Sequence, residues 1–275
     1  MTPISFEFYP PKTDEQRLQL DRTVQKLQPL SPQYASCTFG AGGSTLSYTP
    51  ETVERLRGHH GLDAAPHLSC VGGTRAELAA LLQRYRDMGC RRIVALRGDL
   101  PSGMGQAGEF RYARDLVEFI RQQHDGHFHV EVAAYPEMHP QARDAASDVQ
   151  HFVEKVRAGA DGAITQYFYN ADAYFRFVDD VRARGVEIPI VAGIMPISNF
   201  SQVRRFSEMC GAEIPRWIAQ RMVAFGDDAD SVRAFGAEVV AQLCQRLIDG
   251  GAPGLHFYTL NLAKPTQNVL ARLRA

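Results

Sequence analysis

The chain alternates short hydrophobic runs, rich in β-branched and aromatic residues, with longer segments in which apolar residues recur at helical spacing. The expected strands begin near Ile4, Ala35, Pro66, Arg92, Val130, Gly162, Pro189 and Leu255, at intervals of 31, 31, 26, 38, 32, 27 and 66 residues. A period of about 30 residues is typical of βα units joined by right-handed crossovers, and eight such units close a barrel. The pattern therefore predicts an α/β fold, a (β/α)8 TIM barrel.

An open, doubly wound sheet is the alternative architecture. Its usual dinucleotide signature, GxGxxG after the first strand, is absent, because the chain reads Tyr9-Pro10-Pro11-Lys12 there. The segment from Asn199 to Pro253 has no strand-like run, so we expect two or three helices that elaborate the connection before the last strand. We expect one catalytic domain over residues 1–275 and no regulatory domain.

Helix boundaries are marked by local signals. Thr13 with Gln16, and Thr74 with Glu77, have the spacing of capping boxes, in which side chains satisfy the free N–H groups of the first helical turn. Asn170 or Asp172 is expected to cap a helix with the apolar stripe Phe175, Val178 and Val181 that ends at Gly185.

Side-chain alternation in the first strand separates two faces. Ile4, Phe6 and Phe8 point one way, and Ser5 and Glu7 point the other. The large apolar set suits the face packed against helices, so Glu7 is expected inside the barrel near its C-terminal end. A carboxylate there is unfavourable unless it is paired or has a function.

Other strands also end in polar side chains. These are Ser36, Thr38, His67, Ser69, Arg97, Asp99, Tyr135, Glu137, Gln166, His256 and Tyr258. The C-terminal rim of such barrels is where active sites are built, although strand ends are also polar simply because they meet loops. For Glu7, Asp99 and Gln166 together we favour a functional role, because inward-facing polar groups need partners.

Composition excludes several classes of function. The 30 Lys and Arg balance 31 Asp and Glu, which argues against nucleic acid or anionic lipid as a partner. No apolar run reaches the roughly 18 residues of a membrane span, and no basic segment of a secretory signal opens the chain, so a cytoplasmic protein is expected. The five cysteines form no CxxC pair and the nine histidines no HExxH, so no metal site is predicted.

Two further features have open interpretations. The run Gly40–Thr45 has the composition of a phosphate-binding loop, but also of an ordinary mobile loop. His139, Asp148 and Lys155 have the chemistry and spacing to hold a diphosphate along a helix, and equally those of a solvated helix face.

Eight motifs on different strands, in order, resemble the methylenetetrahydrofolate reductase family nearly from end to end. They are Ser5-Phe6-Glu7-Phe8-Tyr9-Pro10-Pro11-Lys12, Thr38-Phe39-Gly40-Ala41, Pro66-His67-Leu68-Ser69-Cys70, Ala95-Leu96-Arg97-Gly98-Asp99-Leu100-Pro101, Ala133-Ala134-Tyr135-Pro136-Glu137, Ile164-Thr165-Gln166-Tyr167-Phe168, Pro196-Ile197-Ser198-Asn199-Phe200 and His256-Phe257-Tyr258-Thr259-Leu260-Asn261.

The resemblance implies an FAD enzyme on a (β/α)8 barrel. Hydride would pass from NADH or NADPH to the flavin and then to 5,10-methylenetetrahydrofolate, giving 5-methyltetrahydrofolate for methionine biosynthesis. Because both substrates would use the same flavin face in turn, the kinetics should be ping-pong. A cytoplasmic homo-oligomer is expected.

The resemblance also implies residue roles. Glu7 matches the general acid for opening the folate ring, and Asp99 matches a catalytic carboxylate beside flavin and pterin. The positions that match FAD-binding residues are Thr38, Phe39, Ala41, His67, Arg97, Gly98, Asp99, Tyr112, Ala113, Tyr135, His139, Asp148, His151 and Lys155. The positions that match substrate-binding residues are Thr38, Asp99, Gln166, Gln202, Phe206 and Tyr258.

One departure and three rival functions remain. The family commonly has arginine where this chain has Leu262, which puts the folate-tail site in doubt, and Lys264 is a candidate substitute. The rivals are another flavin barrel such as a proline dehydrogenase-like oxidoreductase, a flavin-free reductase of the same folate, and a non-catalytic folate or subunit binder. The presence of Glu7, Asp99 and Gln166 argues against the last.

Overall fold

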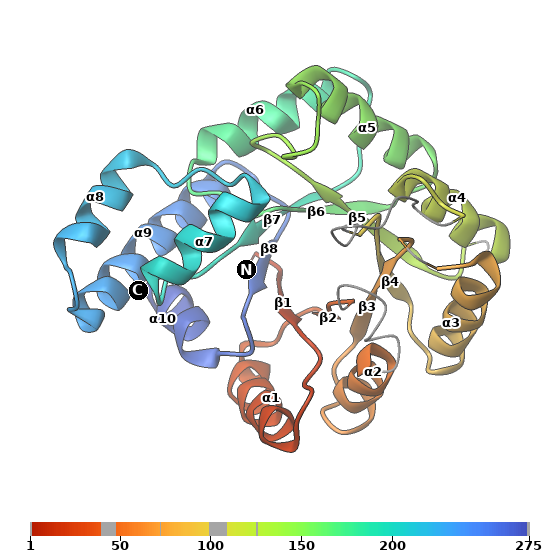
Figure 1. The fold of residues 1–275 in the computed structure, drawn as a ribbon, viewed down its shortest axis with the longest axis horizontal. Coiled ribbons are helices and arrows are strands. Elements are labelled where there is room, and N and C mark those ends of the chain that lie inside the picture. Colours follow the sequence, from red (N-terminus) through yellow and green to blue (C-terminus); the bar gives the residue numbers. More distant parts are fainter. Residues whose placement is uncertain (1, 40–47, 72, 99–108, 125, 274–275) are drawn as a thin grey trace.

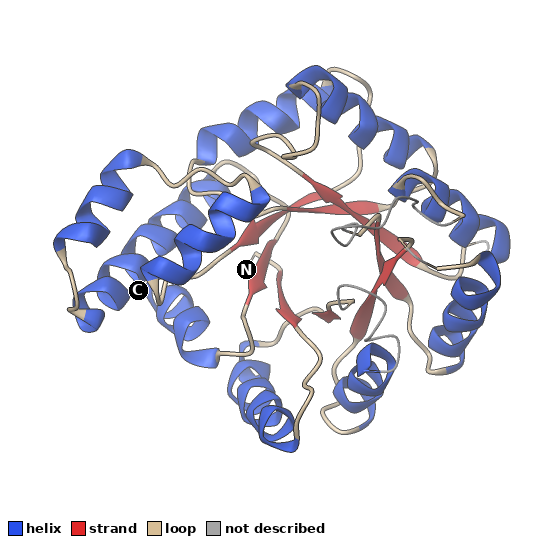
Figure 2. Ribbon diagram, viewed as in Figure 1, coloured by secondary structure: helices blue, strands red, loops and turns tan. Residues whose placement is uncertain are grey.

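The computed structural model describes residues 2–39, 48–71, 73–98, 109–124 and 126–273. Eight parallel strands close into a barrel in chain order, and helices surround it (Figures 1 and 2), which confirms the predicted (β/α)8 fold. The strands are β1 (Ile4–Phe8), β2 (Ala35–Cys37), β3 (Ala64–Ser69), β4 (Arg92–Leu96), β5 (His129–Ala134), β6 (Gly162–Thr165), β7 (Ile190–Ile194) and β8 (Leu255–Tyr258).

Every strand begins within two residues of its predicted start. The largest difference is β3, which begins at Ala64 rather than at Pro66. Cα register places Ala64 opposite Ala35 and Pro66 opposite Cys37, so neighbouring β2 fixes the start of β3. A proline lacks the N–H that a strand interior uses, and for this reason it resembles a strand start in the sequence.

The helices that surround the barrel are α1 (Asp14–Leu27), α2 (Tyr48–Gly58), α3 (Arg75–Asp87), α4 (Ala113–Gln123), α5 (Ala145–Arg157), α6 (Ala171–Arg182), α7 (Phe200–Cys210), α8 (Arg216–Ala224), α9 (Ala229–Asp249) and α10 (Ala263–Leu273), with a short 3-10 helix η1 (Gln28–Leu30). Between β7 and β8 lie α7, α8 and α9, which confirms the predicted helical elaboration, and α8 lies farthest from the barrel in Figure 1. No helix in the described part of the chain is long and apolar enough to cross a membrane.

The helix starts follow the predicted capping chemistry. Thr74 accepts a hydrogen bond from the Glu77 N–H, and the Glu77 carboxylate accepts one from the Thr74 N–H, which completes the box. Thr13 caps α1, but Gln16 accepts from the N–H of Lys12, one residue before the cap. Asn170 caps α6 by accepting from the Asp172 N–H.

Two apolar layers hold the barrel together. Phe6 and Phe8 are almost fully buried in the layer between strands and helices, as the alternation predicted. Inside the barrel a smaller cluster contains Tyr34, Ala65, Val94 and Ile164, with Leu96 and Tyr258 packed against it.

An ionic cluster occupies the N-terminal end of the barrel. Glu131 accepts hydrogen bonds from Arg92 (2.5 Å) and lies 3.1 Å from His129 Nε2, and the Arg92 guanidinium stacks 4.4 Å from the Tyr34 ring centre. A Cβ at Gly162 would lie 2.5 Å from Glu131 Oε2, so a larger residue there would displace the Glu131 carboxylate. The polar groups at this end are thus used structurally, and the opposite, C-terminal end is left for chemistry.

Candidate active site

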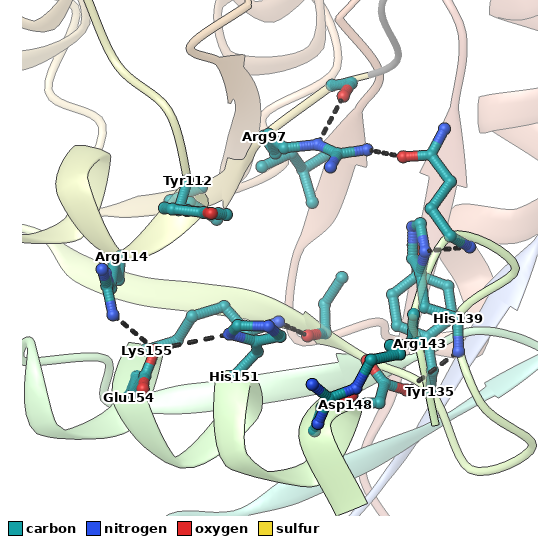
Figure 3. Close-up of a pocket in the computed structure, with 18 residues that line it drawn as sticks. Arg97, Tyr112, Arg114, Tyr135, His139, Arg143, Asp148, His151, Glu154 and Lys155 are labelled. Atoms are coloured by element: carbon teal, nitrogen blue, oxygen red, sulfur yellow. Dashed lines mark hydrogen bonds and ion pairs between the residues drawn. The ribbon is translucent and has the colours of Figure 1, made fainter. Parts of the chain in front are cut away.

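A cavity of about 640 Å³ lies at the C-terminal ends of β4 and β5 and is closed on one side by α5 (Figure 3). Its lining includes nine of the residues predicted to bind the cofactor, namely Arg97, Gly98, Tyr112, Ala113, Tyr135, His139, Asp148, His151 and Lys155. The volume is in the range of small-molecule and cofactor sites. Residues from four separate strand and helix ends therefore meet at one site.

Lys155 supplies a half-buried cation on the α5 wall. Its ammonium donates a hydrogen bond to the Ala133 carbonyl at 2.5 Å. Burial lowers the pKa of Lys155 from 10.5 to about 8, and the nearby Asp148 carboxylate opposes that change. Asp148 in turn accepts from the His139 N–H at 2.8 Å, and this contact ties the loop after β5 to α5. An anion in the cavity would meet a cation that has lost part of its hydration.

The end of β4 forms another wall of the cavity. The Arg97 side chain donates to the Gly98 carbonyl (3.3 Å) and to Gln141 Oε1. Gly98 has a φ of +84°, and a Cβ there would lie 2.0 Å from Ser69 Oγ. Only glycine fits this turn, so bare backbone is exposed to the cavity where a ligand could approach closely.

Aromatic side chains provide a flat surface at the far end. The Tyr112 and His151 rings are nearly parallel (19°) with centres 5.9 Å apart. Arg114 stacks 5.1 Å from the Tyr112 ring centre and donates to Glu154 at 2.5 Å. Figure 3 shows Arg97 across the cavity from His151 and Asp148.

The cavity lining also includes residues that were not predicted: Arg114, Gln141, Ala142, Arg143, Ser147 and Glu154, besides the strand residues Ala95, Leu96 and Ala133. A signal for two of them was present. Ser147 and Glu154 share a helix face with Asp148, His151 and Lys155 at spacings of three, four and seven residues. Gln141, Ala142 and Arg143 lie in the loop between β5 and α5, and Arg114 lies one position beyond the predicted Ala113. No helix or strand periodicity indicated these four residues.

Glu7 lies apart from these residues, at the end of β1, with its side chain 18% exposed. Its Oε2 atom is 3.4 Å from His67 Nε2 and 3.7 Å from His256 Nε2. Burial lowers the pKa of His67, and Glu7 partly offsets this, so the surroundings favour the neutral imidazole. Among the described residues, these two imidazoles are the basic groups within 4 Å of the Glu7 carboxylate, and no lysine or arginine forms an ion pair with it. A structural carboxylate held in an ion pair would instead lie beside a lysine or an arginine.

The remaining predicted residues lie outside the cavity lining. Gln166 borders a small hollow with Tyr135, Glu137, Tyr167 and Cys210, and its Oε1 accepts from the Tyr167 N–H. Burial raises the pKa of Glu137 to about 6, and one of its carboxylate oxygens has no hydrogen-bond partner in the described structure.

Tyr258 donates to the Thr165 carbonyl at 2.6 Å, which fixes its ring above β6. Gln202 and Phe206 lie half-buried on α7, and Thr38 and Phe39 are half-buried after β2. Thr38 donates its N–H to the Phe8 carbonyl at 2.9 Å, beside Glu7 in the chain. Ala41 and Asp99 lie outside the described residues.

A further polar group was not predicted from the sequence. Asp21, His59 and His60 lie close enough together to hold a metal ion. Arg55, however, donates to both Asp21 oxygens (2.7 and 2.5 Å), and His60 contacts the same carboxylate at 2.8 Å. Arg55 therefore already neutralises this carboxylate, and the group is explained as a structural ion pair between α1 and α2.

Comparison with known proteins identifies the protein family. The sequence model of the family "Methylenetetrahydrofolate reductase" matches residues 1–274. The chain is 40% identical over 261 residues to 5,10-methylenetetrahydrofolate reductase of Escherichia coli (strain K12), covering 95% of this chain and 87% of that protein. It is 35% identical to "Methylenetetrahydrofolate reductase (NADH) 1" of Arabidopsis thaliana, covering 99% of this chain and 48% of that protein.

Solved structures share the fold at low sequence identity. An uncharacterized protein from Clostridium thermocellum, described as binding two copies of 5-methyl-5,6,7,8-tetrahydrofolic acid, aligns with a TM-score of 0.66 and 16% identity over 99% of this chain and 93% of that chain. An oxaloacetate acetylhydrolase aligns with a TM-score of 0.55 and 11% identity, over 99% of this chain and 82% of that one. These two show the barrel alone, whereas the full-length sequence matches show that the chain belongs to the methylenetetrahydrofolate reductase family.

Proposed function

We propose that this protein reduces 5,10-methylenetetrahydrofolate to 5-methyltetrahydrofolate, with NADH or NADPH as the hydride source and FAD as the carrier. The observation that carries the proposal is the presence, in a chain of this family, of both a cofactor-sized cavity at the barrel rim and a carboxylate inside the barrel mouth. The name of the Arabidopsis relative specifies NADH, which makes NADH the nucleotide to test first.

The cavity fits the chemistry of FAD. Lys155 and Arg97 offer positive charge for a diphosphate, and the exposed backbone at Gly98 allows close approach. The parallel Tyr112 and His151 rings offer a face for an aromatic ring system. FAD bound there would supply a group that accepts hydride from a nicotinamide and donates it to folate. If both substrates use the same face of the cofactor, the kinetics are ping-pong.

Glu7 has the chemistry that ring opening needs. Breaking the bond between the methylene carbon and N10 leaves the electron pair on N10, and a proton from Glu7 neutralises it. The methylene carbon, now double-bonded to N5, then accepts hydride and becomes the methyl group. Glu7 regains its proton from solvent, so each turnover consumes one hydride and one proton.

Other residues of the rim would bind and orient the folate. Gln166 directly follows β6, Tyr258 ends β8, and Gln202 and Phe206 lie on α7. These elements surround the same barrel mouth as β1 (Figure 1). Asp99 and Thr38 are proposed to contact both folate and flavin, as their positions in the family motifs imply. Oriented contacts of this kind bring the methylene carbon within reach of the hydride donor.

An absorbance spectrum and two half-reactions test the proposal. We expect a yellow protein with about one FAD per chain, bleached by NADH without oxygen and restored to yellow by methylenetetrahydrofolate. A colourless protein that still oxidises NADH with folate would support the flavin-free alternative instead. A yellow protein reduced by proline but not by NADH would support a proline dehydrogenase-like enzyme, and folate binding without turnover would support a binding protein.

A further inference from the structure

His256 lies fully buried inside the barrel, in β8, and both of its ring nitrogens face serine hydroxyls. Nδ1 is 2.7 Å from Ser5 Oγ in β1, and Nε2 is 3.3 Å from Ser36 Oγ in β2. The closure of the barrel brings Ser5 and His256 into register as Cα partners, and Figure 1 shows β8 beside β1. Ser36 and His256 are among the polar residues predicted at strand ends, but no catalytic or binding role was predicted for them or for Ser5.

Two aromatic rings fix the plane of this imidazole. Tyr34 stacks on it at 24° with ring centres 6.0 Å apart, and Tyr258 meets it edge-on at 85° and 5.5 Å. Because Tyr258 is itself held by its hydrogen bond to the Thr165 carbonyl, the ring has little freedom to tilt. The direction in which Nε2 points is thus determined by the barrel interior.

That direction leads to Glu7. The 3.7 Å from His256 Nε2 to Glu7 Oε2 is longer than a hydrogen bond, and catalytic contacts are often long before substrate binds. His67 approaches the same oxygen, Oε2, from β3. Both imidazoles therefore face one of the two carboxylate oxygens.

The short contact to Ser5 fits either tautomer of His256, because a serine hydroxyl can donate or accept a hydrogen bond. In the tautomer in which Ser5 Oγ–H donates to Nδ1, His256 carries its proton on Nε2. This Nε2–H then points toward Ser36 Oγ and Glu7 Oε2, both of which can accept it.

We propose that His256, oriented by Ser5, is a positioning residue for Glu7: its Nε2–H holds Oε2 as a hydrogen-bond acceptor, so that the acid carries its proton on Oε1. A carboxylic acid has one proton, and an oxygen that already accepts an N–H is the poorer place for it. Glu7 would in this way present its proton to the folate in one orientation. The inference rests on the proposed role of Glu7 in folate reduction.

Two substitutions at position 256 separate positioning from simple packing. In His256→Gln the side-chain amide can replace Nε2–H, whereas in His256→Asn it can replace only Nδ1. We expect His256→Asn to slow reoxidation of the reduced enzyme by methylenetetrahydrofolate about 10- to 100-fold, with flavin content and reduction by NADH nearly unchanged. His256→Gln should lose at least fivefold less. His60→Asn, a buried histidine in the α1–α2 ion pair, is the matched control and should slow neither half-reaction.

A second measurement does not depend on activity. Nitrogen-15 NMR of histidine-labelled wild-type protein should show His256 with its proton on Nε2 and not on Nδ1, and Ser5→Ala should shift that signal toward a mixture of tautomers. Protonation on Nδ1 in the wild type would overturn the proposal. So would equal losses in His256→Asn and His256→Gln, or equal slowing of both half-reactions. If wild-type enzyme itself fails either half-reaction, the proposed function is wrong, whatever the His256 tautomer.

Discussion

Replacement of Lys155 by methionine should make the protein more stable and, at the same time, weaken binding of the proposed FAD cofactor. Lys155 lies half-buried in the cavity wall, and its pKa is lowered from 10.5 to about 8 mainly by burial. The charged form of Lys155 is therefore less favourable in the folded protein than in the unfolded chain, and this lowers the stability of the fold. A diphosphate placed against the ammonium would remove this loss of stability, since a nearby anion favours the charged form.

The size of the effect follows from the two pKa values. A decrease from 10.5 to about 8 corresponds to about 3 kcal/mol of lost stability at pH 7. Partial exposure of Lys155 and loss of its hydrogen bond to the Ala133 carbonyl, each about 1 kcal/mol, reduce the expected gain of Lys155→Met to about 1–2 kcal/mol. The loss of stability caused by Lys155 is complete below about pH 8 and disappears as pH rises through 10.5. Lys155→Met should therefore gain less stability at pH 9.5 than at pH 7.

Urea denaturation of the cofactor-free wild type and variant at both pH values measures this gain. Titration with FAD and with ADP measures binding, which we expect to weaken at least 100-fold in the variant. Lys26→Met, an exposed lysine on α1, is the control and should change neither quantity. A variant that is less stable than the wild type, yet binds FAD normally, would refute the assignment of Lys155 as a desolvated anion-binding cation.

Glu7→Gln should keep NADH-dependent flavin reduction but lose reoxidation by methylenetetrahydrofolate by a factor on the order of 100 or more, in anaerobic stopped-flow; equal slowing of both would indicate a structural role. Asp99→Asn should raise the flavin midpoint potential in a redox titration, because the carboxylate that we propose beside the pyrimidine ring would disfavour the charge gained on reduction. An unchanged potential would place Asp99 elsewhere. Arg55 holds the pKa of Asp21 at about 2, so Asp21→Asn should lower stability by about 1–2 kcal/mol at pH 7. This difference should shrink between pH 4 and pH 2 in acid denaturation, and a constant difference would contradict the ion pair.

The sequence alone determined the architecture and the placement of Glu7. Strand alternation has a period of two residues and helix amphipathicity one of 3.6, so both are visible within a few neighbouring residues. The eight strand starts, the Thr74 capping box and the inward direction of Glu7 followed from such local patterns. The family motifs added the residues that line the cavity, and nine of the described ones do meet there.

The tertiary structure alone decided what surrounds those residues. Ser5 and His256 are 251 positions apart, and only closure of the barrel between β1 and β8 brings them within hydrogen-bonding distance. The lowered pKa of Lys155 likewise depends on tertiary structure, because the cavity that buries its side chain is formed by α5 together with the ends of β4 and β5. Local sequence fixes which way a side chain points because backbone geometry repeats over a few residues. Its neighbours across the barrel, and hence its charge state and hydrogen bonds, depend on strand register, which no single segment contains.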